Sequence, residues 1–86
     1  MADVIVYTKD YCPYCTKAKM LLKNKGVEFK EVDITHNPDL QRDVVEKSGG
    51  RRTVPQIFIN GQPIGGFDDM AALDKKSELD TLLNQQ

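Results

Sequence analysis

Residues 4–15 read VIVYTKDYCPYC, an apolar run that a polar loop separates from a pair of cysteines. Val4 to Tyr7 is β-branched and aromatic, and such continuous apolarity is typical of a strand covered on both faces of its sheet. Pro13 then opens a segment with helical spacing, because proline is favoured at the first helical position. The stretch therefore predicts a central strand that leads into a helix, with Cys12 as the N-cap of that helix.

The next residues predict one parallel unit and a second helix. The first helix is expected to end at Gly26, and Val27 to Ile34 follows as a strand. This strand should lie parallel to the first, since a helical crossover joins them. The second helix is expected to run from Asn37-Pro38 to Ser48-Gly49-Gly50, where the paired glycines stop it.

The second half of the chain predicts an antiparallel hairpin and a last helix. Pro55 to Ile59 and Gln62 to Gly65 flank Asn60-Gly61, a dipeptide that favours a tight hairpin turn. The last helix begins at Phe67-Asp68-Asp69, where acidic residues suit the helix dipole. Its expected apolar positions are Met70, Leu73, Leu79, Leu82 and Leu83. The order βαβαββα predicts an α/β fold, with a mixed four-stranded sheet flanked by helices on both faces.

Length and charge narrow the function classes. The chain has 86 residues, with 12 Lys plus Arg, 13 Asp plus Glu and a net charge of −1. Such a chain buries one modest core, so we expect a single domain over residues 1–86 and a monomer. The charge argues against nucleic acid as the main partner, because that binding needs a clustered cationic surface. The sequence has no long apolar run and no signal-like amino terminus, so a cytoplasmic location and no membrane partner are expected.

Cys12 and Cys15 are the two cysteines of the chain, and they are too close together to restrain the unfolded state much. In a reducing cytoplasm, a lone C-x-x-C is more typical of a redox-active or metal-binding pair. The helix start favours the thiolate of Cys12 through its unpaired N–H groups and its dipole, and Lys9 adds positive charge. Cys12 is therefore expected to act as the nucleophile, and Cys15, one turn further along and more buried, as the resolving thiol.

The same residues bear on three other roles for the two cysteines. A structural zinc site needs four ligands, whereas the chain offers two thiols and His36 from a loop, so no metal site is expected within one chain. Inert core cysteines fit poorly, because a helix start next to a lysine activates a thiol. A cluster shared between two chains stays open, since two Cys12 thiolates and outside thiols supply four sulfurs.

Four motifs, in this order, resemble the dithiol glutaredoxins over nearly the whole chain. They are Tyr7-Thr8-Lys9, Cys12-Pro13-Tyr14-Cys15, Thr53-Val54-Pro55 and Gly65-Gly66-Phe67-Asp68-Asp69. The resemblance implies a thioredoxin-like fold and a glutathione-dependent reductase of protein disulfides and protein–glutathione mixed disulfides. Glutathione would be a co-substrate, with no tightly bound cofactor. The protein partners would be disulfide-containing or glutathionylated proteins, with ribonucleotide reductase as one candidate.

The resemblance also implies where the cysteine of glutathione binds. In this family the Val54-Pro55 bond would be cis, and the backbone N–H and C=O of Val54 would pair with that cysteine like an added strand. Tyr14 would flank the tripeptide near the sulfur, and Thr53 would contact it beside Val54. From the residues alone, Pro55 could equally begin an edge strand, where proline is tolerated.

The charged ends of glutathione would meet complementary groups. By resemblance, Lys9 and Arg42 would face the glycine carboxylate. Gly66, with the helix start at Phe67-Asp68, would bind the γ-glutamyl carboxylate through N–H groups, as helix N-termini do, and Asp68 would meet the ammonium. From the residues alone, the two cations could equally be solvated surface charges, and Asp68 an ordinary first-turn acid.

Two rival functions stay open. One is a glutaredoxin-like electron donor that thioredoxin reductase, rather than glutathione, reduces; the other is a dimeric iron–sulfur cluster carrier. The motifs Thr53-Val54-Pro55 and Gly65-Gly66 with Asp68 favour glutathione. Phe67 stands where some members of the resembling family carry a third cysteine. Arg51 and Arg52 are expected to be surface residues.

Overall fold

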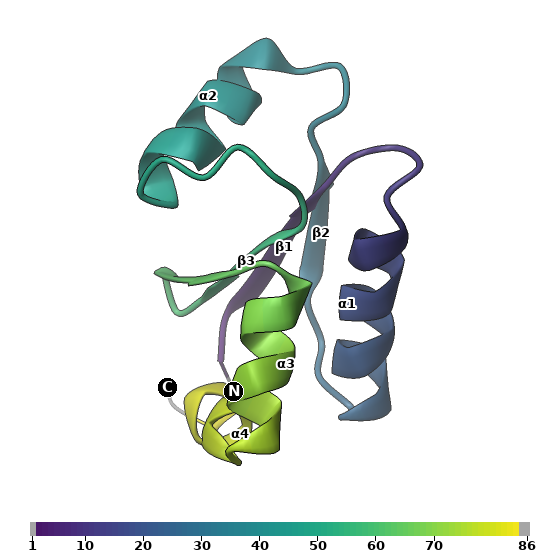
Figure 1. Cartoon of the computed structure of the whole chain (residues 1–86), viewed down its shortest axis with the longest axis vertical. Coiled ribbons are helices and arrows are strands. Elements are labelled where there is room, and N and C mark those ends of the chain that lie inside the picture. The colour runs from purple at the N-terminus through teal and green to yellow at the C-terminus, as the bar shows by residue number, and fades with distance from the viewer. Residues whose placement is uncertain (1, 85–86) are drawn as a thin grey trace.

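A computed structural model describes residues 2–84 of the chain (Figure 1). Its strands are β1 (Val4–Thr8), β2 (Lys30–Asp33), β3 (Gln56–Ile59) and β4 (Gln62–Gly65). Its helices are α1 (Pro13–Asn24), α2 (Pro38–Lys47), α3 (Phe67–Lys75) and α4 (Glu78–Leu83). The strands form one sheet in the order β2-β1-β3-β4, in which β1 is parallel to β2 and antiparallel to β3. The predicted mixed four-stranded sheet is confirmed.

The central strand β1 is buried on both faces, as its apolar sequence predicts. Val4 and Val6 pack into a core cluster with buried side chains of α1, α3 and α4, whereas Tyr7 packs with Val44 of α2 in a second cluster. Figure 1 shows α1 and α2 on opposite sides of this strand. Full burial of each large apolar side chain contributes roughly 1.5–3 kcal/mol to the stability of the fold. The two clusters therefore hold β1 in place, and with it the start of the loop that follows β1.

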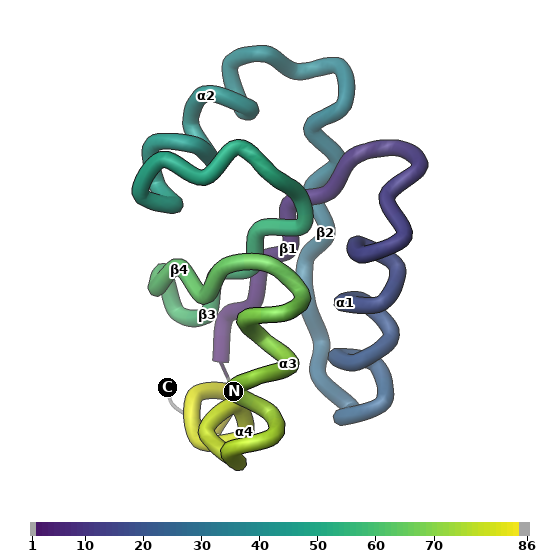
Figure 2. Tube along the Cα trace, viewed as in Figure 1, coloured from purple at the N-terminus to yellow at the C-terminus, as the bar shows by residue number. Residues whose placement is uncertain are grey.

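The two edges of the sheet are polar or interrupted. β2 carries Lys30, Glu31 and Asp33 on one edge, and β4 carries Pro63 on the other. β4 pairs antiparallel with β3 after the turn at Asn60-Gly61, which confirms the predicted hairpin. Figure 2 shows the tube passing from β4 directly into α3. No helix within residues 2–84 is long and apolar enough to cross a membrane.

The strand predicted over Val27–Ile34 is shorter than expected and begins only at Lys30. The N–H of Val27 donates to the carbonyl of Leu22 at 3.0 Å, and Gly26 has a φ of 71°, so the backbone here closes the end of α1. Val27 packs against the first core cluster without joining the sheet. Its apolar character therefore reflects a helix end that covers the core.

The prediction of one continuous last helix is wrong, because the chain turns between α3 and α4. Ser77 adopts a φ of 60° at the break, and the turn brings Leu79 back onto the first core cluster. Lys25 binds Asp74 at 2.6 Å and Asp80 at 2.9 Å, one carboxylate on each side of the break. These two carboxylates raise the pKa of Lys25.

An ion pair joins the segment before β3 to the start of α3. Arg51 Nη1 donates to Asp69 Oδ2 at 2.6 Å, and the N–H of Gly66 donates to the same oxygen at 2.9 Å. Both bonds lower the pKa of Asp69, the bond from Arg51 more strongly. A Cβ at Gly65, where φ is +112°, would collide with both Arg51 and Asp69, so a glycine here lets the pair form.

We predict that the Arg51–Asp69 pair contributes less stability in acid. Because the pKa of Asp69 is lowered by folding, its carboxylate stabilises the fold above the ordinary pKa of about 4, and this contribution is lost as pH falls through the folded pKa. Urea unfolding of wild type and Asp69→Asn should show a difference in unfolding free energy that shrinks between pH 6 and pH 2.5. A difference independent of pH would contradict this.

We also predict that the fold survives reduction of the Cys12–Cys15 disulfide. The two cysteines are separated by 3 positions, so the disulfide closes a minimal loop, while the core clusters draw on both faces of the sheet. Thermal melts followed by circular dichroism, with and without dithiothreitol, should both show a cooperative transition. A reduced protein without a cooperative transition would show that the disulfide is needed for the fold.

Candidate functional site

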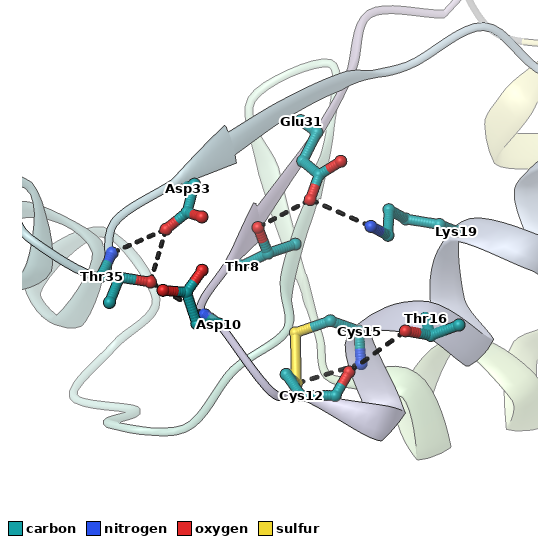
Figure 3. A network of polar contacts seen from close by, with 9 residues as sticks. All are labelled: Thr8, Asp10, Cys12, Cys15, Thr16, Lys19, Glu31, Asp33 and Thr35. Carbon is teal, nitrogen blue, oxygen red and sulfur yellow. Dashed lines mark hydrogen bonds and ion pairs between the residues drawn. A yellow bond between two sulfur atoms is a disulfide. The ribbon is translucent and has the colours of Figure 1, made fainter.

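The cysteine pair sits where β1 gives way to α1, as the sequence predicts. Cys12 is the N-cap of α1, with Pro13 at the first helical position, and its Sγ accepts a hydrogen bond from the N–H of Cys15 at 3.1 Å. The two sulfurs are joined in a disulfide, with their Cα atoms 5.1 Å apart (Figure 3). Cys15 is only 3% exposed, whereas Cys12 is partly exposed. A reagent from solvent therefore reaches Cys12 first.

The turn before β3 lies against the same sulfur. The Val54-Pro55 peptide bond is cis, which confirms the form that the resemblance implied. The Sγ of Cys12 lies 3.6 Å from the carbonyl oxygen of Val54, although the two residues are 42 positions apart in sequence. The fold thus brings the backbone of Val54 beside the sulfur, where it can pair with a peptide-like ligand.

A cavity of about 400 Å³, here called the α3 cavity, lies between this turn and the start of α3. It brings together every predicted glutathione-binding residue except Lys9 and Arg42. Its lining residues are Tyr14, Arg51, Thr53, Val54, Pro55, Gly66, Phe67, Asp68 and Asp69. The ring centroids of Tyr14 and Phe67 are 6.4 Å apart, so the cavity has an aromatic wall as well as a helix N-terminus.

Lys9 and Arg42 line a neighbouring cavity of about 540 Å³ beside α2, here called the α2 cavity. The two cavities share Arg51, Thr53 and Val54, so they meet at the turn before β3. Arg42 pairs with Asp39 one turn away, and both side chains are largely exposed. Because exposed pairs are weak, Arg42 can exchange this partner for an incoming carboxylate.

A third cavity of about 530 Å³, here called the thiol cavity, lies on the other side of the cysteines. It is lined by Lys9, Cys12 and Cys15, among others, and shares no residue with the α3 cavity. Within residues 2–84, no three or more His, Cys, Asp or Glu side chains are grouped so that they could hold a metal ion.

Sequence reasoning missed two polar contacts near the site. Arg51 was expected to be a plain surface residue, but it pairs with Asp69 and lines the α3 cavity. Thr8, which is 2% exposed, donates to Glu31 at 2.9 Å, and Lys19 binds the same carboxylate oxygen at 3.1 Å (Figure 3). The sequence shows two acids, Asp68 and Asp69, at the start of α3, but no spacing pattern identifies Arg51 as the cation that binds Asp69.

Comparison with known proteins agrees with this geometry. A family model described as Glutaredoxin matches residues 4–64. Glutaredoxin 3 of Escherichia coli strain K12 is 53% identical over 83 residues, which cover 96% of this chain and 99% of that protein.

Solved structures agree as well. The solution structure of a glutaredoxin from Brucella melitensis is 51% identical with a TM-score of 0.85, covering 96% of this chain and 89% of that one. The crystal structure of a buckwheat glutaredoxin–glutathione complex is 29% identical with a TM-score of 0.86, covering 95% and 76%. The thioredoxin-like fold is confirmed. Since both family and fold agree with a C-x-x-C pair at a helix start, the chain belongs to the glutaredoxin family of thiol–disulfide oxidoreductases.

Proposed function

We propose that this protein reduces protein disulfides and protein–glutathione mixed disulfides, with glutathione as co-substrate and no tightly bound cofactor. Cys12 is the nucleophile and Cys15 the resolving thiol. The observation that carries the proposal is the position of Cys12: its sulfur accepts the N–H of Cys15 at 3.1 Å and lies 3.6 Å from the Val54 carbonyl, beside the α3 cavity. The whole chain acts as one glutaredoxin domain, in the cytoplasm.

For a glutathionylated protein, one cysteine suffices. The Cys12 thiolate attacks the glutathione sulfur; the protein–glutathione bond breaks, a Cys12–glutathione disulfide forms, and the protein leaves as a thiolate that takes a proton from water. A glutathione thiolate then attacks the bound glutathione sulfur. Oxidised glutathione leaves, and the Cys12 thiolate is restored. The N–H of Cys15 serves both steps, because it stabilises negative charge on the Cys12 sulfur.

For a protein disulfide, both cysteines are needed. Cys12 attacks first, because it is the more exposed of the two, and forms a mixed disulfide with one target cysteine while the other leaves as a thiolate. Cys15 then attacks the Cys12 sulfur and releases the reduced target. Two glutathione molecules reduce the resulting Cys12–Cys15 disulfide and leave as oxidised glutathione.

The lining of the α3 cavity supports glutathione as the small thiol. A tripeptide with two carboxylates and one ammonium needs N–H groups, cations and an acid in sequence along one groove. The start of α3 at Gly66 and Phe67 would offer N–H groups to the γ-glutamyl carboxylate, and Asp68, which lines the same cavity, would face its ammonium. Tyr14, Thr53 and the Val54-Pro55 backbone would hold the middle of the tripeptide.

The α2 cavity would hold the other end of glutathione. Lys9 and Arg42 line it, and it adjoins the α3 cavity at Thr53 and Val54. The glycine carboxylate would thus lie on the cationic side of the turn, with the γ-glutamyl group at the start of α3. The glutathione sulfur would then lie beside Val54, whose carbonyl oxygen is 3.6 Å from the Cys12 sulfur.

We expect Cys12→Ser to abolish turnover of a glutathionylated peptide and Cys15→Ser to keep most of it, because only Cys12 takes part in that reaction. The assay couples oxidised glutathione to NADPH consumption through glutathione reductase. With a protein disulfide as substrate, both variants should be inactive. If Cys15→Ser were the variant that loses the peptide reaction, the assignment of roles would be reversed. Turnover that required thioredoxin reductase in place of glutathione would overturn the choice of co-substrate.

We expect Asp68→Asn to raise the KM for glutathione roughly two- to fivefold with little change in kcat, since an exposed charge pair with the ammonium contributes only modestly. Glu78→Gln is the matched control, because Glu78 is an exposed acid in the first turn of α4 just as Asp68 is in α3. An equal KM for both variants would place the γ-glutamyl group elsewhere.

A further inference from the structure

Tyr11, directly before the nucleophile, is fully exposed, at 102% of its reference area. A single exposed aromatic side chain is ordinary in proteins, so exposure alone assigns it no role. Two features set this residue apart: the backbone on both sides of it is fixed, and its own backbone adopts a conformation that tyrosine rarely takes.

The backbone before Tyr11 is held by a short polar chain. The N–H of Asp10 donates to Thr35 Oγ1 at 2.8 Å, and Asp33 Oδ1 in turn accepts from the hydroxyl of Thr35 at 2.6 Å and from its N–H at 2.8 Å (Figure 3). Hydrogen bonding to Thr35 lowers the pKa of Asp33, so this anchor carries a charged acceptor at neutral pH. The backbone after Tyr11 is held by Cys12 as the N-cap of α1.

Between these two anchors, Tyr11 has a φ of 54°. The left-handed region is unfavourable for a bulky side chain, and residues held there are found where the surrounding structure overrules their preference, often at functional sites. The result is an aromatic ring with only two side-chain torsions left to settle, presented to solvent beside the thiol. A tyrosine on a fixed backbone is well suited to contact a partner, because only its two side-chain torsions become ordered on binding.

The position of the ring relative to the cavities decides what it can contact. Tyr11 and Cys12 both line the thiol cavity, which shares no residue with the α3 cavity. The α2 cavity touches the thiol cavity at Lys9, but Tyr11 lines neither the α2 nor the α3 cavity, so it is not among the residues proposed to bind glutathione. The other participant in the exchange is a polypeptide. In a protein disulfide its cysteine sulfur bonds to Cys12 itself, and in a glutathionylated protein it lies one S–S bond, about 2 Å, beyond the sulfur that Cys12 attacks. Since consecutive Cα atoms are about 3.8 Å apart, residues flanking that cysteine are within reach of the exposed ring of Tyr11, one position before Cys12.

We propose that Tyr11 is a docking residue for the polypeptide substrate and contacts an apolar side chain next to the substrate cysteine. The inference rests on the proposed function, and it adds a preference that glutathione chemistry alone does not supply. An aromatic residue at the centre of a contact is the type that carries binding energy in protein interfaces.

The test compares three substrates in the glutathione-coupled assay. Two are peptides with one glutathionylated cysteine, flanked by leucines in one and by serines in the other; the third is the mixed disulfide of glutathione with free cysteine. Tyr11→Asn removes the ring but keeps a residue that tolerates the left-handed region. It should lower kcat/KM for the leucine peptide roughly three- to tenfold, the size of a moderate aromatic contact, and leave the other two substrates unchanged.

Two further variants separate the ring from other effects. Tyr11→Phe should keep the wild-type preference for the leucine peptide. Met20→Asn removes an apolar side chain that is 56% exposed on α1, eight positions after Cys12, and should change none of the three rates.

The outcomes distinguish this inference from the function on which it rests. No glutathione-dependent turnover of any substrate by the wild type would refute the proposed function itself. Normal turnover with an equal effect of Tyr11→Asn on all three substrates, or with no effect on any, would refute docking. In size-exclusion chromatography, the reduced wild type could elute as a dimer and Tyr11→Asn as a monomer, with peptide rates unchanged. That result would refute substrate docking and show that Tyr11 contacts a second copy of the chain.

Discussion

Thiol–disulfide exchange at Cys12 depends on the hydrogen bond from the Cys15 N–H to the Cys12 sulfur, and the rest of the fold holds this contact in place. It needs a helix that begins at Cys12, and that helix needs a strand before it that cannot shift. β1, buried between two core clusters, meets this need. The turn at Val54-Pro55 lies beside the same sulfur, although it is 42 positions further along the chain, because the strand that follows it, β3, pairs with β1.

Much of this could be predicted from sequence, and the failures have physical causes. Continuous apolarity identified β1, and Pro13 identified the start of α1. Val27 looked like part of a strand because the same apolar side chain serves a helix end that packs on the core. The break at Ser77 carries neither glycine nor proline, so no local signal marked it; packing of Leu79 and the two bonds of Lys25 hold it instead.

The functional site was also predictable only in part. The redox pair followed from spacing and helix electrostatics, whereas the glutathione contacts came from resemblance to a family and stay a proposal. Arg51 and Asp69 are 18 positions apart and on different elements, and no spacing rule joins such a pair. Tyr11 could not be singled out either, because its role depends on a backbone angle and on the anchor at Thr35, neither of which residue type reveals.

The polar edges of the sheet have a consequence for a protein that forms covalent bonds with others. In the proposed mechanism a disulfide tethers the chain to a polypeptide, which brings the edges of the sheet close to the partner's backbone. Charged side chains on β2 and Pro63 in β4 oppose strand pairing at these edges. The tether can then be cut by a single exchange of sulfur, and the two chains separate without leaving an aggregate behind.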